Sequence, residues 1–343
     1  MIDVLGQAAS LGGSEGLPGS DRAAMVTVIR VAGSVPRRPG AKMIVHTDGR
    51  LISTVGGGRV ENDVVQVARA VASGAGPAQR WCVHLVRDLA MCCGGEMELW
   101  IEPIDALRAP ALTQVVRARA ARTPVVLRTA LEAPGGKQIV PSESEDECLR
   151  TRRPRLEAGA FFEPVLPPAR LVIFGSGHIA AAIAPLAAAV GFEVVISDDN
   201  EAQASAARFP AAARVLDSFD PAEVEPLLGS LAGDYVLIAT RDHAVDQSLL
   251  ERLLGRADLA FIGMVGSRGK LGRFRRRLEA RGIGDDAAWA RLRSPVGLPI
   301  GAETPEEIAV AIVAELVQTR ARGSSPPWPS PSPSADAAFL SRG

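Results

Sequence analysis

Two adjacent cysteines followed by two glycines are the residues of this sequence best suited to do chemistry. The stretch DLAMCCGGEMELW places Cys92 and Cys93 directly before Gly94 and Gly95. A thiolate is stabilised when backbone amides donate hydrogen bonds to it, and glycine leaves such amides unshielded. Thiolates also suit soft or redox-active metals. The sequence therefore predicts a reactive or metal-contacting thiol here, and the alternative is a pair of small apolar residues buried at a turn.

Two further interpretations use the same cysteines. In the first, Cys82 and His84, which share one face of a predicted strand, join Cys92 and Cys93 in a zinc site. The spacing is not a usual zinc pattern, and adjacent cysteines are poor ligands for one ion. In the second, Cys92 or Cys93 accepts sulfur itself, so that the protein is a persulfide carrier.

A second glycine cluster lies upstream, in the segment TVGGGRVEN. Gly56, Gly57 and Gly58 precede a helix, which is predicted because apolar residues recur at helical spacing over residues 60–72. Free amides at a helix N-terminus bind anions, and Arg59 adds a positive charge. The segment thus predicts an amide-lined anion pocket, with an ordinary turn as the alternative.

The segment GSGHIA matches the dinucleotide-binding fingerprint and stands between a predicted strand and a predicted helix. Its key positions are Gly175, Gly177 and Ala180. Asp198 and Asp199 follow about 20 residues later, where a carboxylate accepts hydrogen bonds from a ribose and repels a 2′-phosphate. This pattern favours NAD over NADP and suggests an NAD-dependent oxidoreductase, with His243 as acid or base or merely as a residue that caps a loop. The alternative is a tight turn that lets helix and strand pack.

The segment GMVGSRGK also follows a predicted strand, so it lies at the edge of the sheet where such folds bind ligands. Gly266, Ser267 and Arg268 are therefore predicted to hold a phosphate through backbone amides and the guanidinium. Four arginines over residues 273–277 are interpreted as a solvated helix face. In GAETPEEIAV, Thr304 and Glu307 form a predicted capping box, so the glutamates there are structural.

Composition limits the classes of protein to consider. The chain has 343 residues, 47% of them hydrophobic, and a net charge of −1. That charge gives no general reason to expect nucleic acid or an anionic membrane as a partner. With four cysteines, no secretory signal and no apolar run of about 20 residues, the sequence predicts a cytoplasmic protein. A homodimer is expected on general grounds alone.

Changes in sequence pattern predict an α/β protein of two domains with loose ends. Residues 21–166 alternate strand and helix signals in the manner of an α+β domain, including a hairpin at Asp48 and Gly49. Residues 167–321 repeat strand, glycine turn and helix, which is typical of a doubly wound, Rossmann-like parallel sheet. Residues 1–20 are expected to be a flexible N-terminus and residues 322–343 a disordered Pro/Ser tail.

Six segments in order resemble one known family, the xanthine dehydrogenase accessory proteins (XdhC/CoxI). They are GSVPRRPGAKMIVHTDGRLISTVGGGRVE, CCGGEMELWIEP, FGSGHIA, TRDHAVD, GMVGSRGK and PIGAETPEEIAVAI. The resemblance covers residues 21–320. It implies a chaperone that binds molybdenum cofactor and protects it while a partner cysteine desulfurase installs its terminal sulfido ligand. It also implies delivery to a xanthine dehydrogenase-like apoenzyme, and a protein that is not itself a turnover enzyme.

The resemblance also assigns roles to the candidate residues. The family's CGGE pattern maps onto residues 93–96, so Cys93 is implied as the thiolate that contacts molybdenum and Cys92 as a second contact or a variant position. The segment from Gly56 to Arg59 is implied to hold the pterin or the phosphate. The glycine loop at residues 175–180 is implied to take a nucleotide or the tail of the cofactor, in either its molybdopterin or its dinucleotide form.

Overall fold

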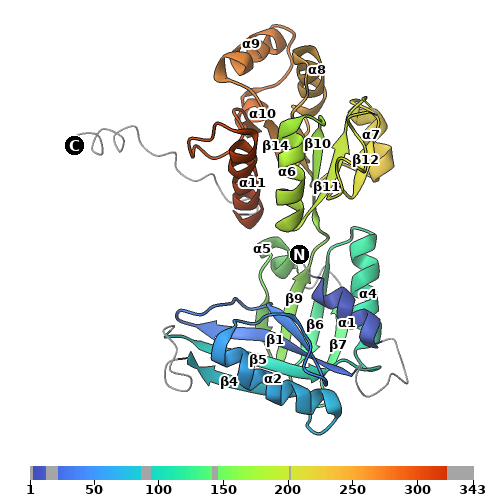
Figure 1. Ribbon diagram of the computed structural model, residues 1–343, viewed down its shortest axis with the longest axis vertical. Coiled ribbons are helices and arrows are strands. Elements are labelled where there is room, and N and C mark those ends of the chain that lie inside the picture. Colours follow the sequence, from blue (N-terminus) through green and yellow to red (C-terminus); the bar gives the residue numbers. More distant parts are fainter. Residues whose placement is uncertain (1–2, 13–21, 86–93, 141–145, 201, 323–343) are drawn as a thin grey trace, which may run out of the picture. The chain divides into compact units, whose positions relative to one another are not determined.

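The computed structural model describes residues 3–12, 22–85, 94–140, 146–200 and 202–322. The chain divides into two compact units, residues 1–168 and 169–343 (Figure 1). Both units mix helices and strands, so the predicted α/β class is confirmed. Cys92, Cys93 and the tail from residue 323 lie outside the described residues.

The first unit contains a five-stranded antiparallel sheet that is covered on one face by a long helix. The strands lie in the order β3 (Leu51–Ser53), β2 (Lys42–His46), β1 (Ala23–Ala32), β5 (Glu96–Pro103) and β4 (Gln79–His84). The predicted hairpin is the pair β2 and β3. Helix α2 (Gly58–Ser73) buries valines such as Val60 and Val64 against alternate residues of β1, β2 and β5. Its apolar stripe therefore fixes which sheet face is covered and which is left for other contacts.

A second antiparallel sheet completes this unit. Its strands lie in the order β7 (Gly136–Val140), β6 (Val125–Ala130), β9 (Ala160–Val165) and β8 (Arg155–Glu157). The helices are α4 (Ala109–Ala120) and the short α5 (Asp146–Thr151). Apolar residues of α4 form one core cluster with residues of β1, β2, β6 and β9. The cluster thus joins the two sheets.

The expectation that residues 1–20 are flexible is wrong for part of that segment. Residues Val4–Gly12 form helix α1, whose Leu5 and Ala8 are buried in the same cluster as α4. The segment is short and rich in small residues, and an isolated helix of this length is marginal in water. Its stability comes from tertiary packing, which local sequence pattern does not report.

The second unit is a single sheet of six parallel strands. They lie in the order β12 (Arg214–Leu216), β11 (Phe192–Ser197), β10 (Ala169–Phe174), β13 (Tyr235–Ile238), β14 (Phe261–Met264) and β15 (Leu292–Arg293). The helices are α6 (His178–Ala189), α7 (Pro221–Leu228), α8 (His243–Leu253), α9 (Arg268–Glu279), α10 (Asp286–Arg291) and α11 (Pro305–Arg322). This is the doubly wound arrangement that the alternation of patterns predicts.

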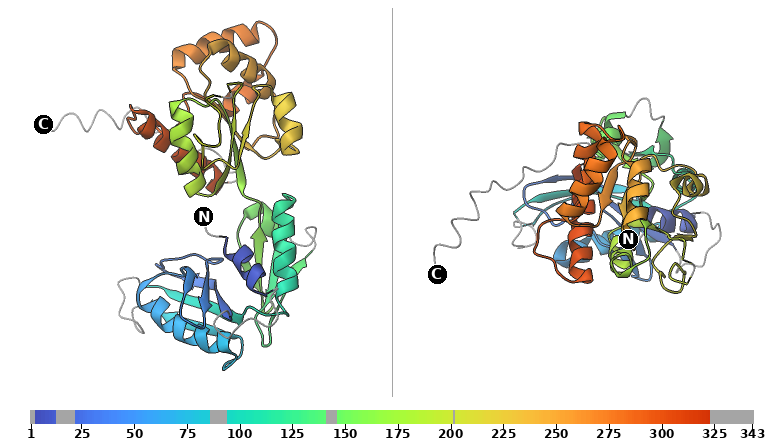
Figure 2. Two further views of the ribbon diagram at one scale, coloured as in Figure 1. Left: turned by 45° about the vertical axis from the view of Figure 1, so that its right-hand side comes forward. Right: turned by 90° about the horizontal axis from the view of Figure 1, so that it is seen from above.

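Alternate residues of the central strands supply two separate cores. Helices α6 and α11 lie on one face of the sheet (Figure 2). They pack against the side chains of Leu171 and Ile173. On the other face α7 to α10 pack against those of Val172 and Phe174. Because both faces are covered, the strands are continuously apolar, and their carboxyl ends are the edge where polar loops gather.

Two smaller predictions are also confirmed in this unit. The Thr304 hydroxyl accepts from the Glu307 amide at 3.2 Å, and the Glu307 carboxylate accepts from the Thr304 amide at 3.1 Å, which is a capping box at the start of α11. The arginines of residues 273–277 are all exposed on α9. Among the described residues, no helix is long and apolar enough to cross a membrane.

Candidate functional site

Three segments that are distant in the first unit's sequence meet at one place. A Cβ atom on Gly95 would lie 2.4 Å from the carbonyl oxygen of Ser34, and one on Gly56 would lie 2.7 Å from Cγ of Pro36. Gly33 approaches the Gly95 backbone in the same way, at 3.2 Å. The loop after β1 therefore packs against the glycines of both GGGRVE and CCGGE, and these motifs form one site region.

The glycines of this region are required for two different reasons. Gly56, Gly57 and Gly58 have φ angles of 154°, 70° and 62°, which residues other than glycine rarely adopt. Gly95 is instead buried and needs to lack a side chain because the loop after β1 approaches so closely. Gly94 is exposed. Of the two glycines that were predicted to carry unshielded amides, only Gly94 is therefore accessible to a ligand.

The protein's own side chains occupy the predicted anion pocket of the GGG segment. The Gly57 amide donates to the Glu61 carboxylate at 3.1 Å, and the Gly56 amide donates to the Thr54 hydroxyl at 3.2 Å. Glu61 also accepts from the Thr54 hydroxyl. A bound anion would therefore have to displace Glu61, while Arg59 is exposed at the second position of α2. Anion binding here stays a prediction.

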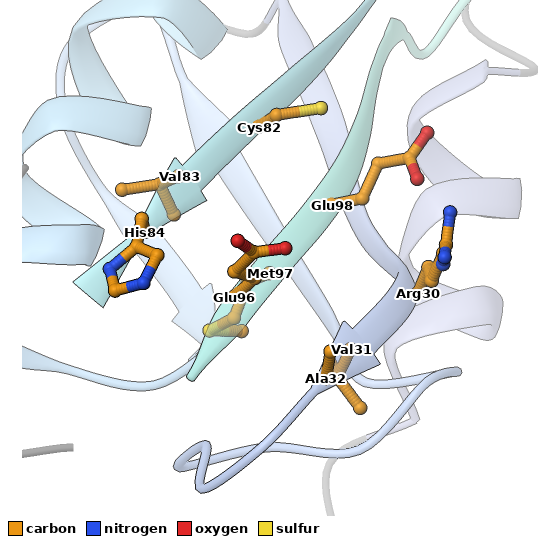
Figure 3. A pocket seen from close by; sticks show the side chains of 9 residues that line it. All are labelled: Arg30, Val31, Ala32, Cys82, Val83, His84, Glu96, Met97 and Glu98. Atoms are coloured by element: carbon orange, nitrogen blue, oxygen red, sulfur yellow. The ribbon is translucent and has the colours of Figure 1, made fainter. Parts of the chain in front are cut away.

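A polar pocket lies beside this region, on the face of the first sheet away from α2. Its volume is about 330 Å³ and it is lined by residues of β1, β4 and β5 (Figure 3). In the strand register Glu98 faces Cys82 and Arg30, and Glu96 faces His84 and Ala32. Glu96 directly follows the glycine pair, so the pocket begins where the CCGGE motif ends.

Charges in the pocket act on the thiol of Cys82. Burial raises its pKa above the ordinary value, and Glu98 acts in the same direction, while Arg80 and Arg30 oppose them. Glu98 is held by Arg80 at 2.9 Å. Cys82 is exposed. Because its pKa is raised, it remains a neutral thiol at neutral pH, which makes it a poor nucleophile. Across the described ranges, no three residues of the ligand types His, Cys, Asp and Glu are grouped to hold a metal ion.

An ionic network that no sequence motif indicates lies buried between the two sheets. Lys42, from the segment GAKMIV, pairs with Glu163 of β9, and both side chains are less than 10% exposed. Burial lowers the pKa of Lys42, and the attraction of Glu163 opposes that effect. Nearby Glu102 lies 2.8 Å from Lys137 and accepts from Arg108 at 2.9 Å. A lysine at the start of an otherwise apolar strand was the only sequence signal for this network.

In the second unit, the glycine loop has the geometry of its fingerprint. Gly175 has a φ angle of 125°, and a Cβ atom there would lie 2.2 Å from the carbonyl oxygen of Ala239. Gly177 precedes α6 in an extended conformation with open space beside it, and Ala180 is buried against the sheet. The first glycine is thus required by close approach to the chain after β13, and the second leaves room for a ligand.

The acidic residue of the fingerprint, Asp198, is occupied by the protein itself. One carboxylate oxygen accepts from the amide and the hydroxyl of Ser176, at 2.8 and 2.7 Å. The other accepts from the amide of Asn200 at 3.0 Å and from Arg241 at 2.9 Å. A carboxylate has about four acceptor positions, and these four hydrogen bonds fill them.

Arg241 also bonds Asp199, at 2.8 Å, so its guanidinium bridges both carboxylates that were predicted to meet a ribose. Its side chain is 57% exposed, and the two carboxylates raise its pKa. A ribose can reach Asp198 only if Arg241 leaves. NAD binding through Asp198 therefore stays a prediction that requires this displacement.

The motifs TRDHAVD and GMVGSRGK meet in a buried ion pair at the same sheet edge. Lys270 pairs with Asp246, whose other oxygen accepts from the Thr240 hydroxyl at 2.7 Å. Ser267 caps α9 by accepting from the Lys270 amide at 3.2 Å. These residues hold the loops together, so Ser267 has a structural role as a helix cap. Its contact with a ligand stays a prediction.

The remaining predicted residues of this edge are open to solvent or are close to Lys270. Arg268 is exposed at the start of α9, and a Cβ atom on Gly266 would lie 2.8 Å from Cδ of Lys270. His243 is the first residue of α8 and is exposed, while Asp242 caps that helix by accepting from the Ala244 amide. His243 therefore does not cap the loop, and its role as an acid or base stays a prediction.

Comparison with known proteins shows matches over both units. The family model described as XdhC and CoxI family matches residues 19–84, and the XdhC Rossmann domain matches residues 171–316. A protein of Bacillus subtilis, named as a probable xanthine dehydrogenase subunit, is 28% identical over 89% of this chain and 96% of its own length. The molybdenum cofactor insertion chaperone PaoD of Escherichia coli is 31% identical over 56% of this chain and 58% of its own length.

A solved structure agrees with the fold of the whole chain. The crystal structure of a protein described as a xanthine dehydrogenase from Bacillus halodurans superposes with a TM-score of 0.78, at 28% identity, over 95% of this chain and 98% of that one. The two family models together take in the GGGRVE loop of the first unit and the GSGHIA, TRDHAVD and GMVGSRGK segments of the second. This chain belongs to the XdhC and CoxI family.

Proposed function

We propose that this protein is an accessory factor of a molybdoenzyme that binds molybdenum cofactor, protects it during sulfuration and delivers it to a xanthine dehydrogenase-type enzyme. Its homologues indicate the general role, because one is named as an insertion chaperone for this cofactor and another as part of a xanthine dehydrogenase. The partners in this proposal are the molybdenum subunit of the target enzyme and a cysteine desulfurase that supplies the sulfur.

The observation that carries the proposal is the meeting of three loops in the first unit. Gly33, Gly56 and Gly95 bring the segments GSVPRRPG, GGGRVE and CCGGE into contact beside a polar pocket. A carrier of this cofactor needs a soft ligand for molybdenum close to polar groups for the pterin. Cys93, which lies outside the described residues, is the proposed thiolate because it is two residues before Gly95 in the sequence.

Cys82 does not compete for the role of Cys93. Its pKa is raised by burial and by Glu98, so it supplies little thiolate at neutral pH. In the second unit, Gly177 and the exposed Arg268 are proposed to contact a nucleotide or the cofactor's tail. The cofactor in this proposal is molybdopterin or its dinucleotide form.

Copurification of the pterin tests this function. The full chain is purified without oxygen from a molybdenum-replete host and oxidised, and the fluorescent pterin product is quantified. We expect product from the wild type and a several-fold lower yield from Cys93→Ser.

Cys148→Ser is the matched control, because Cys148 is buried and its thiol donates to the Arg153 carbonyl, a bond that a serine hydroxyl can also make. Its yield should equal that of the wild type. No pterin in the wild type, or equal yields from wild type and Cys93→Ser, would contradict the proposal.

A further inference from the structure

The pocket on the face of the first sheet away from α2 has a set of side chains suited to a ligand. Glu96 and Glu98 are two residues apart on β5, so both carboxylates project from the same face. Arg30, Cys82 and His84 line the same space from the neighbouring strands (Figure 3). None of these five side chains belongs to the buried ionic network, and only Glu96 belongs to a glycine motif, as the last residue of CCGGE.

The carboxylates of the pocket have acceptor capacity to spare. Arg80 donates to Oε1 of Glu98 at 2.9 Å, and the Glu98 side chain is only 14% exposed, so this bond fixes its orientation. Within the described residues, no hydrogen bond is made to the side chain of Glu96. The pocket therefore presents one carboxylate that is oriented by Arg80 and one to which no described residue donates, and both can accept from a ligand that offers N–H groups.

We propose that this pocket seats the pterin ring of the cofactor, with Glu96 and Glu98 accepting from its amino-pyrimidinone edge. This inference rests on the proposed function. That edge carries an amino group and a ring N–H side by side, which match the acceptor oxygens of a carboxylate. The Arg30 guanidinium supplies donors for the neighbouring carbonyl oxygen of the ring.

The size and position of the pocket support the same ligand. Its volume of about 330 Å³ lies at the lower end of ligand sites, which suits one bicyclic ring but not a whole dinucleotide. Ala32 and Glu96 face each other in the strand register, so this end of the pocket directly follows Gly94 and Gly95 in the chain. The raised pKa of Cys82 keeps that thiol neutral, so it adds no third negative charge beside the carboxylates.

Guanine presents the same amino-pyrimidinone edge as a pterin, so the test includes both. The intrinsic fluorescence of 6-hydroxymethylpterin is followed while the full chain is titrated, for wild type, Glu96→Gln and Glu98→Gln. Each substitution replaces an acceptor oxygen by an amide group, and we expect a loss of affinity of about tenfold or more. Glu132→Gln, an exposed residue after β6 of the other sheet, is the control and should bind as the wild type does.

The outcomes separate this inference from the proposed function. If the wild type copurifies with the cofactor but both pocket variants bind the pterin probe as tightly as it does, the pocket assignment is overturned and the function stands. If GMP binds at least as tightly as the pterin, with the same dependence on Glu96 and Glu98, the pocket is a guanine site and the assignment is again overturned. Since Glu96 is exposed, its variant has no expected folding defect that could obscure the result.

Discussion

Arg241 occupies the two carboxylates that were predicted to hold a ribose beside the glycine loop of the second unit. It occupies one acceptor position on Asp198 and one on Asp199, and the other three positions on Asp198 belong to Ser176 and Asn200. Replacing Arg241 by methionine removes the guanidinium but keeps a side chain of similar length. The variant should therefore expose two carboxylate oxygens at the place where a ribose is held in this kind of fold.

The expected gain can be worked out from the exposure of the ion pairs. The Arg241 side chain is 57% exposed, so solvent screens its two contacts, and each is worth about 0.5–1 kcal/mol. A ribose that binds to the wild type must overcome both contacts, a cost of about 1–2 kcal/mol. Arg241→Met removes this cost, so NAD should bind roughly 5- to 30-fold more tightly to the variant.

Calorimetry of the full chain with NAD and NADH measures this difference. Arg252→Met is the matched control, because Arg252 pairs with Asp220 at similar exposure on the same unit and touches no part of the glycine loop. Unchanged affinity in Arg241→Met would refute the reasoning, as would micromolar binding of NAD by the wild type with no further gain in the variant.

Two further predictions concern the first unit. Lys42→Met alone should lower the free energy of unfolding by about 3–5 kcal/mol, because it leaves Glu163 buried without a counter-charge. The double variant Lys42→Met with Glu163→Leu should lower it by less than about 1 kcal/mol. Denaturant unfolding followed by circular dichroism measures both values, and a double variant as unstable as Lys42→Met would contradict the prediction. Alkylation of Cys82 by iodoacetamide, mapped by mass spectrometry, should be slow at neutral pH and rise only above the ordinary thiol pKa, because a raised pKa leaves less thiolate at a given pH. Glu98→Gln removes a negative neighbour and should move that profile to lower pH, and a profile unaffected by this change would count against the electrostatic explanation.

The second unit could be derived from sequence pattern to a large extent. Its strands are continuously apolar and its last helix begins at the capping box of Thr304 and Glu307, so element type and order follow from local signals. The position of GSGHIA between strand and helix also identified the edge of the sheet where polar loops gather. Each of these signals lies within one short segment of the chain.

The contacts that decide what the sites can do were not accessible in the same way. Asp198 and Arg241 are separated by 43 residues, and Lys42 and Glu163 by 121. No periodicity or motif specifies such pairs, because each depends on how separate strands and loops are placed by the fold. Helix α1 was missed for the same reason, since its burial depends on α4 and not on its own sequence.

The two units differ in how much of their polar chemistry is left for a ligand. In the second unit, the four acceptor positions of Asp198 are filled, and Lys270 and Asp246 form a buried ion pair. In the first unit, Glu96 is exposed in a pocket and the described residues donate nothing to its side chain. A ligand gains most from groups that do not have to give up an existing partner, because breaking a satisfied hydrogen bond offsets the new one. We therefore expect specific recognition to depend on the strands next to the CCGGE motif. The GSGHIA fingerprint has its usual geometry, but it is weaker evidence for a ligand than unfilled acceptors in a pocket.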